Sequence, residues 1–260
     1  KHNMRIDIAY KTLAELRAFT AQDVRVNKKI FMTDEGKEGE WYYDSTDTTS
    51  ADNIGTIIVT TSGGFRFKRI YDKYVYSEWF GAKPNDSSFN SGAAINLAIA
   101  VGGKVKLKAG TYYSTEKILI NRNDFILEGE GKFNTVIQTK SGFSGSALVA
   151  VGSAAMQPYD VTVKNLRINS NASGTGTNVS ALEIDAQYNI DIDSCWMQGG
   201  DYNGTLTASV NVKLSKHLRF TSCNFTNGVS YGVMFSCAAY DDTMFNDCQF
   251  DENQVDIIVL

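Results

Sequence analysis

Four eight-residue segments in the second half of the chain align without gaps, and this repeat limits the possible folds more than any other feature. The segments are Val161–Ile168, Ile190–Met197, Leu218–Phe225 and Thr243–Phe250, with starts 29, 28 and 25 residues apart. Positions 1, 3, 6 and 8 are apolar in each segment, apart from Thr243, and position 5 is always Asn, Ser or Asp. A period of this length predicts a fold of stacked repeats.

Each repeat contains short strands and no helix. Alternation of apolar and polar residues at positions 1 to 4 is typical of a strand, and the phase slip at position 5 predicts a bend into the next strand. Eight residues before the last three segments lie further alternating triplets, Leu182–Ile184, Val210–Val212 and Phe235–Cys237. Three short strands per repeat are one coil of a parallel β-helix. The LxxLxLxxN pattern of a leucine-rich repeat is absent.

Like positions of successive coils are expected to stack about 4.8 Å apart, the usual strand spacing. This register predicts an inward column of Leu166, Cys195, Cys223 and Cys248. We interpret these cysteines as small buried hydrophobic residues, because four Cys in 260 residues are too few for a disulfide scaffold. A disulfide between neighbouring coils is geometrically allowed, but nothing in the sequence indicates one. Two of the predicted outward columns are Thr162, Asp191, Arg219, Met244 and Arg167, Trp196, Asn224, Gln249.

The first part of the chain has a different pattern. Thr12 and Glu15 form the capping-box signature of a short helix over residues 12–19. Between residues 24 and 76, alternating stretches separated by turn residues predict a small antiparallel β domain. This domain precedes the repeats and lacks their period.

One longer helix separates the two patterns. Residues 91–101 are amphipathic at helical spacing, and Gly102 ends this predicted helix. We therefore predict an all-β protein of two domains, a small N-terminal domain over residues 1–80 and a parallel β-helix with a capping helix over residues 81–260.

The composition argues against several classes of function. A net charge of -4 disfavours nucleic acid as the main partner, because phosphate contacts need clustered Lys and Arg. No apolar run approaches the ~18 residues that a membrane helix needs, so we expect no membrane partner. Only His2 and His217 are available as imidazole ligands and no CxxC pair exists, so we expect no metal site and no cofactor.

Three motifs follow one another around the predicted helix. Residues 78–82 read EWFGA, residues 102–112 read GGKVKLKAGTY, and residues 125–131 read FILEGEG. The chain resembles the pectate-lyase-like, right-handed parallel β-helix family of phage tailspikes and polysaccharide depolymerases. In that family a WFGA segment and a helix cap the β-helix, and a GGxVxLxxGxY strand begins its first coil. The segment before residue 80 also resembles the small N-terminal domain of such proteins.

The resemblance implies a function in recognising a polysaccharide on a bacterial surface. It implies a homotrimer, located in a virion tail or outside the cell, whose N-terminal domain attaches to a phage tail or baseplate protein. Depolymerisation by a glycoside hydrolase or a polysaccharide lyase is the first hypothesis. The second is a non-catalytic structural or adhesion module of a phage tail or cell-surface fibre.

Two features depart from the family pattern. Tailspike-like sequences usually carry a Gly-Asp-Gly and paired Asp after the WFGA segment, where this chain has KPNDSSFN over residues 83–90. Leu260 lies inside the strand-like run Val255–Leu260, so we expect further coils or a further domain beyond this sequence.

Glu183, Asp185 and Asp191 are the candidate catalytic carboxylates. Glu183 and Asp185 lie two residues apart on one predicted strand, so both are expected to face outward, with Cα atoms roughly 6.5 Å apart. Such a pair can supply the acid and base of inverting glycoside hydrolysis. The plainer interpretation is that these residues are solvated, with Asp191 in an exposed ion pair with Arg219 worth about 0–1 kcal/mol. In trimeric spikes a partner carboxylate can also come from another subunit.

Trp196, Arg167 and Arg219 are the candidate sugar-binding residues. An outward Trp offers a large apolar ring on which a sugar can stack. The alternatives for Trp196 are burial under a loop such as 198–208, or a place in a subunit interface. No metal-binding residues are predicted.

Two further groups are candidates for a catalytic role. His217 is a candidate base for a lyase, helped by the positive charge of Lys213, Lys216 and Arg219, although an exposed turn histidine is the plainer interpretation. Asp241–Asp242 resembles one fragment of a polygalacturonase signature. The His-Gly of that signature is absent, so we attribute the pair to a turn.

Overall fold

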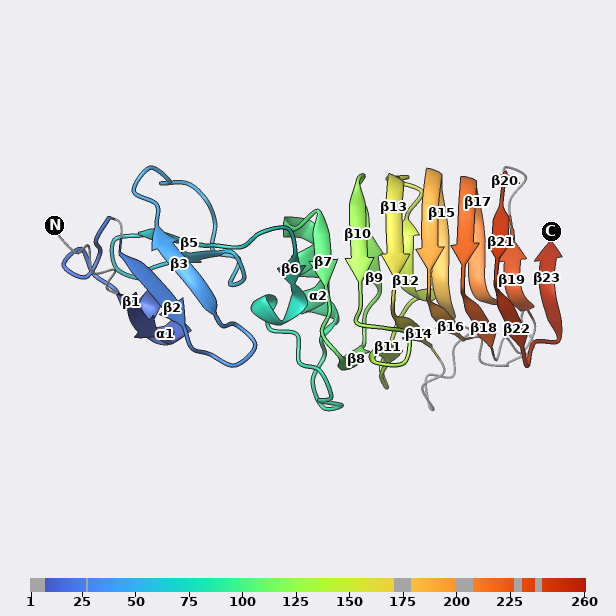
Figure 1. Cartoon of the computed structure of the whole chain (residues 1–260), viewed down its shortest axis with the longest axis horizontal. Coiled ribbons are helices and arrows are strands. Elements are labelled where there is room, and N and C mark those ends of the chain that lie inside the picture. Colours follow the sequence, from blue (N-terminus) through green and yellow to red (C-terminus); the bar gives the residue numbers. More distant parts are fainter. Residues whose placement is uncertain (1–7, 27, 171–178, 200–207, 227–230, 237–239) are drawn as a thin grey trace, which may run out of the picture.

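The computed structural model describes residues 8–260 except 27, 171–178, 200–207, 227–230 and 237–239. The described chain forms a small β domain and a parallel β-helix, which lie one after the other along one long axis (Figure 1). Coils of the β-helix stack along this axis, so that each strand pairs with its counterpart in the next coil. The predicted fold is confirmed. Cys237, the end of one predicted triplet, lies outside the described residues.

The small domain is a five-stranded sheet with one short helix. Its strands lie in the order β1 (Ile8–Lys11), β2 (Lys29–Met32), β3 (Gly39–Tyr43), β5 (Arg66–Arg69), β4 (Ile57–Val59). Helix α1 (Leu13–Arg17) begins at the predicted capping box, where Thr12 and Glu15 bond to each other's backbone N–H. The core of the domain consists of Leu16, Phe19, Ile30, Met32, Trp41, Ile58 and Phe67.

Two details of this domain differ from the prediction of an antiparallel sheet. β1 pairs with β2 in parallel, because the segment that contains α1 carries the chain back before β2 begins. The remaining pairs, β2 with β3, β3 with β5 and β4 with β5, are antiparallel. Val24 and Val26 precede β2 instead of belonging to a strand, and the Val26 side chain is exposed.

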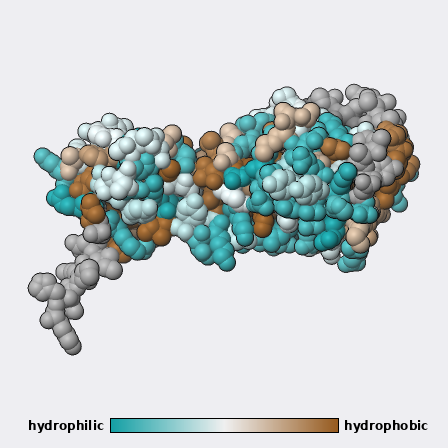
Figure 2. Space-filling view, turned by 90° about the horizontal axis from the view of Figure 1, so that it is seen from above, coloured by the Kyte–Doolittle hydropathy of each residue, from teal (hydrophilic) through white to brown (hydrophobic). Residues whose placement is uncertain are grey.

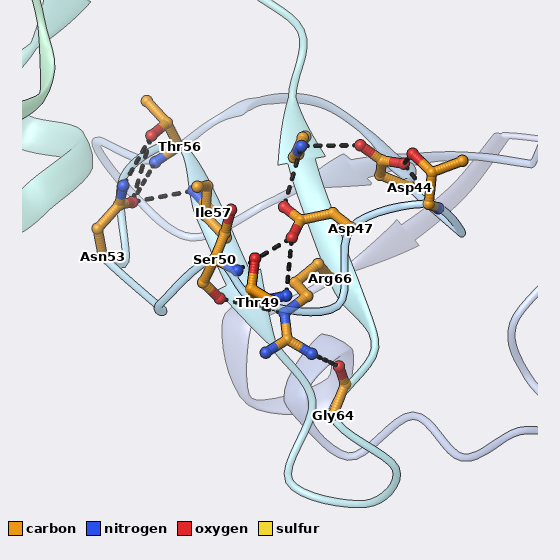
Figure 3. A network of polar contacts seen from close by, with 11 residues as sticks. Asp44, Asp47, Thr49, Ser50, Asn53, Thr56, Ile57, Gly64 and Arg66 are labelled. Atoms are coloured by element: carbon orange, nitrogen blue, oxygen red, sulfur yellow. Dashed lines mark hydrogen bonds and ion pairs between the residues drawn. The ribbon is translucent and has the colours of Figure 1, made fainter.

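Side chains hold the polar loop between β3 and β4, as Figure 3 shows from close by. Asp47 accepts hydrogen bonds from the backbone N–H groups of Thr49 (3.1 Å) and Ser50 (3.0 Å). Lys68 of β5 forms ion pairs with Asp44 (2.7 Å) and Asp47 (3.0 Å). The loop is therefore fixed by turns of the Asx type and by its contact with the sheet.

A short segment and the predicted helix close the N-terminal end of the β-helix. β6 (Val75–Tyr76) pairs with β7 (Lys104–Lys106), and the 3-10 helix η1 (Ser77–Phe80) follows β6. Helix α2 (Gly92–Val101) agrees with the predicted helix, and the Gly102 N–H bonds to the Ala98 carbonyl at its end. The buried side of α2 packs into the same core as the coils.

The coils present three faces. The first face consists of β9 (Ile118–Ile120), β12 (Ala147–Gly152), the beginnings of β15 (Ser180–Asp193) and β17 (Ala208–Thr221), β19 (Tyr231–Phe235) and β23 (Val255–Val259). The second face consists of β6, β7, β10 (Phe125–Glu128), β13 (Tyr159–Lys164), the ends of β15 and β17, β20 (Tyr240–Asp241) and β21 (Met244–Asn246). The third face consists of β8 (Gly110–Ser114), β11 (Thr135–Thr139), β14 (Arg167–Asn169), β16 (Trp196–Gln198), β18 (Asn224–Thr226) and β22 (Gln249–Asp251).

Two columns of residues with a left-handed backbone conformation, that is a positive φ, turn the chain between these faces. Position 5 of each repeat has a φ between 52° and 57° and makes the predicted bend from the second to the third face; these residues are Asn165, Ser194, Ser222 and Asp247. A second column precedes position 1 and has a φ between 50° and 55°; its members are Asp160, Asn189, His217 and Asp242. Asn, Asp and His adopt this conformation more readily than most residues.

The second column explains one difference from the prediction. The triplet Leu182–Ile184 and the segment that starts at Ile190 were expected to be separate strands, but both belong to β15. Asn189 redirects the backbone while its neighbours Tyr188 and Ile190 stay paired with the preceding coil. The ladder therefore continues through the bend.

The predicted inward column is confirmed. Cys195 and Cys223 are buried and Cys248 is partly buried, and all three are free thiols. Burial raises the pKa of the Cys223 thiol to about 12, which agrees with the interpretation of these residues as small hydrophobic groups. Stacked rings lie nearby in the core, with Phe225 and Phe250 of successive coils 4.7 Å apart.

Hydrophilic residues cover much of the β-helix surface in the view of Figure 2, and hydrophobic residues gather near its last coils. The exposed apolar residues of this end include Val255, Ile257, Val259 and Leu260. Among the residues that the structure describes, no helix is long and apolar enough to cross a membrane.

Candidate functional site

The structure distributes the six predicted site residues over all three faces of the β-helix. Glu183 and Asp185 belong to the first face, where β15 pairs with β12. Asp191 and Arg219 are paired neighbours on the second face. Arg167 and Trp196 are paired neighbours on the third face. The six residues therefore cannot form one site within a single chain.

The second face carries a groove of about 690 Å³, which we call the second-face groove. It crosses successive coils, from β13 through β15 and β17 to β21. Its lining residues are Asp160, Asn189, Asp191, His217, Leu218, Arg219, Asp242, Thr243 and Met244. Two predicted site residues and the candidate base His217 therefore meet in one place.

Polar contacts between neighbouring coils organise the second-face groove. The Arg219 guanidinium lies 3.5 Å from the Asp191 carboxylate. The imidazole Nδ1 of His217 lies 3.3 Å from the carboxylate of Asp242. These four side chains are between 44% and 74% exposed, so the groove is open to water and accessible to a polymer.

The second left-handed column gives the groove one of its walls. Asp160, Asn189, His217 and Asp242 occupy equivalent bends in four successive coils, so their side chains form a row. The amide of Asn189 donates a hydrogen bond of 2.8 Å to the Asp160 carboxylate. Asp160 and Asn189 were not among the residues predicted from the sequence, and Asp242 was attributed to a turn. The signal that identifies them is a residue prone to positive φ directly before position 1 of each repeat.

A pair of tyrosines lies on the same strands as the groove. The rings of Tyr159 and Tyr188 are stacked, with centroids 5.2 Å apart and planes at 11°. Tyr188 is 39% exposed and directly precedes Asn189 of the groove wall. Exposed tyrosine rings can contact the apolar face of a sugar while their hydroxyls bond to its polar edge. This pair was not predicted from the sequence.

The environment of Glu183 differs from the expected one. Although it was expected to face solvent, its residue is only 5% exposed. Its carboxylate lies 2.9 Å from Lys213 Nζ and 3.7 Å from Lys117 Nζ, and it accepts a hydrogen bond of 3.1 Å from the Ser146 hydroxyl. Burial raises the pKa of Glu183, but the hydrogen bond from Lys213 and the two lysine charges outweigh burial and lower that pKa overall.

Asp185 is also buried, with 9% of its surface exposed. It accepts a hydrogen bond of 3.0 Å from the Gln157 side chain, whereas Glu183 contacts lysines. The expectation that both carboxylates are exposed is therefore wrong, because side chains from neighbouring coils and connecting segments cover them. Their assignment as an acid–base pair stays a prediction.

Trp196 on the third face is already in contact with other side chains. The Arg167 guanidinium lies over its ring, 4.0 Å from the centroid, and the Phe133 ring meets it edge-on at 5.8 Å. The indole N–H donates a hydrogen bond of 2.7 Å to the Thr226 hydroxyl. Phe133, which the sequence analysis missed, is the ring most open to solvent in this cluster, at 75%. Residues 200–207 of the loop expected to cover Trp196 lie outside the described residues.

Within the described ranges, no group of three or more His, Cys, Asp or Glu side chains is arranged to hold a metal ion. The expectation that the protein uses no metal and no cofactor stays a prediction.

Residues 9–72 match the family model of the phage tail protein small four-stranded beta-sheet domain. The gp42 tailspike of Acinetobacter phage vb_AbaP_AS12 aligns with a TM-score of 0.72 at 15% identity, over 98% of this chain and 48% of that one. The chain has the tailspike fold. The family match agrees with the predicted place of the protein in a virion tail.

Two other tailspike-like structures extend this comparison. The gp49 tailspike of Acinetobacter baumannii bacteriophage Fri1, a capsular polysaccharide depolymerase, aligns with a TM-score of 0.70 at 15% identity, over 95% of this chain and 49% of that one. Pantoea stewartii WceF, a glycan biofilm modifying enzyme, aligns with a TM-score of 0.51 at 14% identity, over 97% of this chain and 44% of that one. The chain thus spans less than half the length of each of these three structures. At such identities the likeness concerns the fold and transfers no site residue.

Proposed function

We propose that this protein is a tailspike that binds a bacterial surface polysaccharide in the second-face groove and depolymerises it. The observation that carries the proposal is the meeting of Asp191, His217, Arg219 and Asp242 in one open groove across successive coils. A groove that crosses the strands runs along the stacking axis, and each further coil adds about 4.8 Å to it. Such a surface suits an extended polymer better than a small molecule.

The chemistry of the groove supports carbohydrate as the ligand. Carboxylate, amide, imidazole and guanidinium groups of the lining can bond to hydroxyl groups. Tyr159 and Tyr188 do not line the groove, but each directly precedes a residue that does, and the exposed Tyr188 ring can contact a sugar. Pairs of Asp or Glu residues are the usual catalytic groups of glycoside hydrolases. The Fri1 tailspike, a capsular polysaccharide depolymerase, is one of the structures with this fold.

The test is a reducing-end assay of the protein on a panel of bacterial capsules and O-antigens. We expect new reducing ends with at least one polysaccharide, and their loss in the variants D191N and H217A. The matched control is D251N, because Asp251 is an exposed carboxylate on the third face. Equal loss in D251N, or undiminished cleavage by D191N and H217A, would place the activity elsewhere.

Binding without cleavage is the second candidate function, that of an adhesion module. The observation that favours it is the exposure of the groove side chains, because many catalytic sites exclude water from the reacting groups. In that case the panel yields no new reducing ends, and D191N and H217A weaken binding of one polysaccharide while D251N does not.

We further propose that the small domain, predicted over residues 1–80, attaches the protein to a phage tail or baseplate protein. The match of residues 9–72 to a phage tail domain supports this role. We also propose a homotrimer, and the third-face cluster of Phe133, Trp196 and Arg167 is a candidate part of its interface. Equilibrium sedimentation tests this proposal. We expect the mass of three chains for the parent protein and a smaller mass for the variant F133S.

A further inference from the structure

We infer that the second-face groove takes a neutral polysaccharide, one without uronate carboxylates, and cleaves it by hydrolysis instead of β-elimination. The inference rests on the proposed function and narrows it, because composition and fold alone leave hydrolase and lyase equally open. The inference is based on two observations: carboxylates outnumber cationic groups in the groove, and each cationic group lies beside a carboxylate.

Carboxylates outnumber cationic groups in the lining of the groove. Asp160, Asp191 and Asp242 face one arginine, Arg219, and one histidine, His217. Each cationic group lies beside a carboxylate, Arg219 at 3.5 Å from Asp191 and His217 at 3.3 Å from Asp242. The field of such a groove repels a polyanion and tolerates an uncharged chain.

The lysines that would reverse this balance lie elsewhere. Lys213, counted in the sequence analysis as help for a lyase base, forms an ion pair of 2.9 Å with Glu183 on the first face. Lys216 is not among the residues that line the groove. Of the three cationic residues near His217 in the sequence, Arg219 alone lines the groove.

β-Elimination makes demands that this arrangement does not meet. A base must remove the proton next to the uronate carboxylate, and cationic groups must stabilise the negative charge that develops on that carboxylate. Arg219 is the one always-cationic side chain in the lining, and a uronate would have to displace Asp191 from it. Displacement would leave the Asp191 carboxylate without its cation beside the incoming carboxylate.

Hydrolysis fits the same groups. Asp191 and Asp242 lie two coils apart, which is roughly 10 Å along the stacking axis at about 4.8 Å per strand, and they are offset by two residues, roughly 7 Å, along the strand. Carboxyl groups that flank a glycosidic bond at about 6.5–9.5 Å leave room for a water molecule and give inversion. The two backbone positions are then roughly 12 Å apart, so the two side chains must turn toward each other to reach that separation.

The step balances with these two carboxyl groups alone. One carboxylic acid gives its proton to the glycosidic oxygen, which leaves with the electron pair of its bond to the anomeric carbon. Water attacks that carbon from the opposite side, and the other carboxylate takes the proton that the water loses. His217 is then a positioning residue that holds Asp242, and Arg219 positions Asp191.

The experiment compares neutral chains, such as dextran and neutral O-antigens, with uronate polymers, such as polygalacturonate and hyaluronan. Reducing ends and the ultraviolet absorbance of unsaturated sugars are recorded together for the parent protein, D191N, D242N and the control D251N. We expect reducing ends from a neutral chain without unsaturated product, and a loss of roughly 100-fold or more in D191N and D242N. D251N should behave as the parent, and thermal unfolding confirms that each variant is folded.

Other outcomes separate this inference from the proposed function. Unsaturated product from a uronate polymer overturns the inference but keeps the function as a depolymerase. If nothing is cleaved, equilibrium binding decides between two outcomes. Preferred binding of a neutral chain that D191N weakens supports the substrate class and overturns the hydrolysis. Preferred binding of a uronate polymer that R219A abolishes overturns the substrate class and the hydrolysis. No binding of any polymer that depends on the groove residues overturns the inference and the proposed function together.

Discussion

The guanidinium of Arg219 lies 3.5 Å from the carboxylate of Asp191, across two neighbouring coils of the β-helix. The two side chains are 56% and 44% exposed, so water and salt screen their attraction. We predict that D191A, R219A and the double variant change the free energy of unfolding by less than about 1 kcal/mol each. The same substitutions should weaken polysaccharide binding, because both residues line the groove.

Urea unfolding of the parent and the three variants measures this pair through a double-mutant cycle. A coupling free energy well above about 1 kcal/mol would show that the pair serves to hold the coils together. The functional assignment of both residues would then lose its support.

The pairing of Asp191 with Arg219 is the part of this site that could be predicted from the sequence. Because strands of a β-helix stack in register, aligning the repeats was enough to place Arg219 between Asp191 and Met244. That alignment covers only eight residues of each coil. Asp160 and His217 lie one residue before it, where positive φ rather than apolar alternation marks the column.

On the first face, the burial of Glu183 and Asp185 could not be predicted from the repeat. The alternation correctly put Glu183 and Asp185 on one side of a strand, but burial depends on what covers that side. Ser146 and Gln157, which contact them, come from segments between strands that have no repeat pattern. Chain segments of this kind are placed by tertiary packing, so the exposure of the two carboxylates was not predictable from periodicity.

Glu183 provides the next prediction. Its carboxylate is buried between Lys213 and Lys117, so we expect E183Q to destabilise the protein by about 1–3 kcal/mol. The folded-state pKa of Glu183 is lowered, so its ion pairs stabilise the fold above the ordinary pKa of 4.5 and are lost as the pH falls below it. The difference in stability between parent and E183Q should therefore shrink in acid.

Urea unfolding at neutral pH and at several acidic pH values checks this expectation, with D251N as the exposed control. The same variant tests the catalytic assignment made from the sequence. If E183Q keeps its stability but loses all cleavage, Glu183 acts in catalysis and the structural role is refuted.

The loop network of the small domain predicts a separate response to acid. Hydrogen bonds from Lys68 and Thr46 lower the pKa of Asp44 to about 2, and bonds from Ser50 and Lys68 lower the pKa of Asp47 further. Groups with a lowered folded-state pKa stabilise the fold above their unfolded value, near 3.9, and this contribution is lost as the pH falls toward about 2. The loop should open before the β-helix unfolds.

Hydrogen exchange of the Thr49 and Ser50 amides between pH 5 and pH 2.5 measures this opening, because both donate to Asp47. We expect D47N to exchange these amides faster already at pH 5, with D72N as the control, since Asp72 is exposed. Unchanged protection in D47N would mean that the backbone of the loop, and not the carboxylate, keeps it closed.

The last prediction concerns the junction of the two domains, where Arg69 of β5 is only 4% exposed. Its guanidinium lies over the rings of Trp41 (4.6 Å) in the small domain and Trp79 (4.2 Å) in η1. It also donates hydrogen bonds of 2.7–2.8 Å to the carbonyls of Gly55, Glu38 and Lys37. One cation thus fixes the small domain against the end of the β-helix.

Replacing this side chain leaves three carbonyl groups without their donor and two indole rings without their cation. We expect R69A to lower the stability of the small domain by about 3 kcal/mol or more and to free it from the β-helix. Small-angle scattering should show a larger radius of gyration, and proteases should cut faster near residues 70–74, which connect β5 to β6. The exposed Arg25 gives the control R25A. A compact, protease-resistant R69A would mean that packing around Phe80, whose ring leaves no room for a Cβ at Gly55, holds the junction instead.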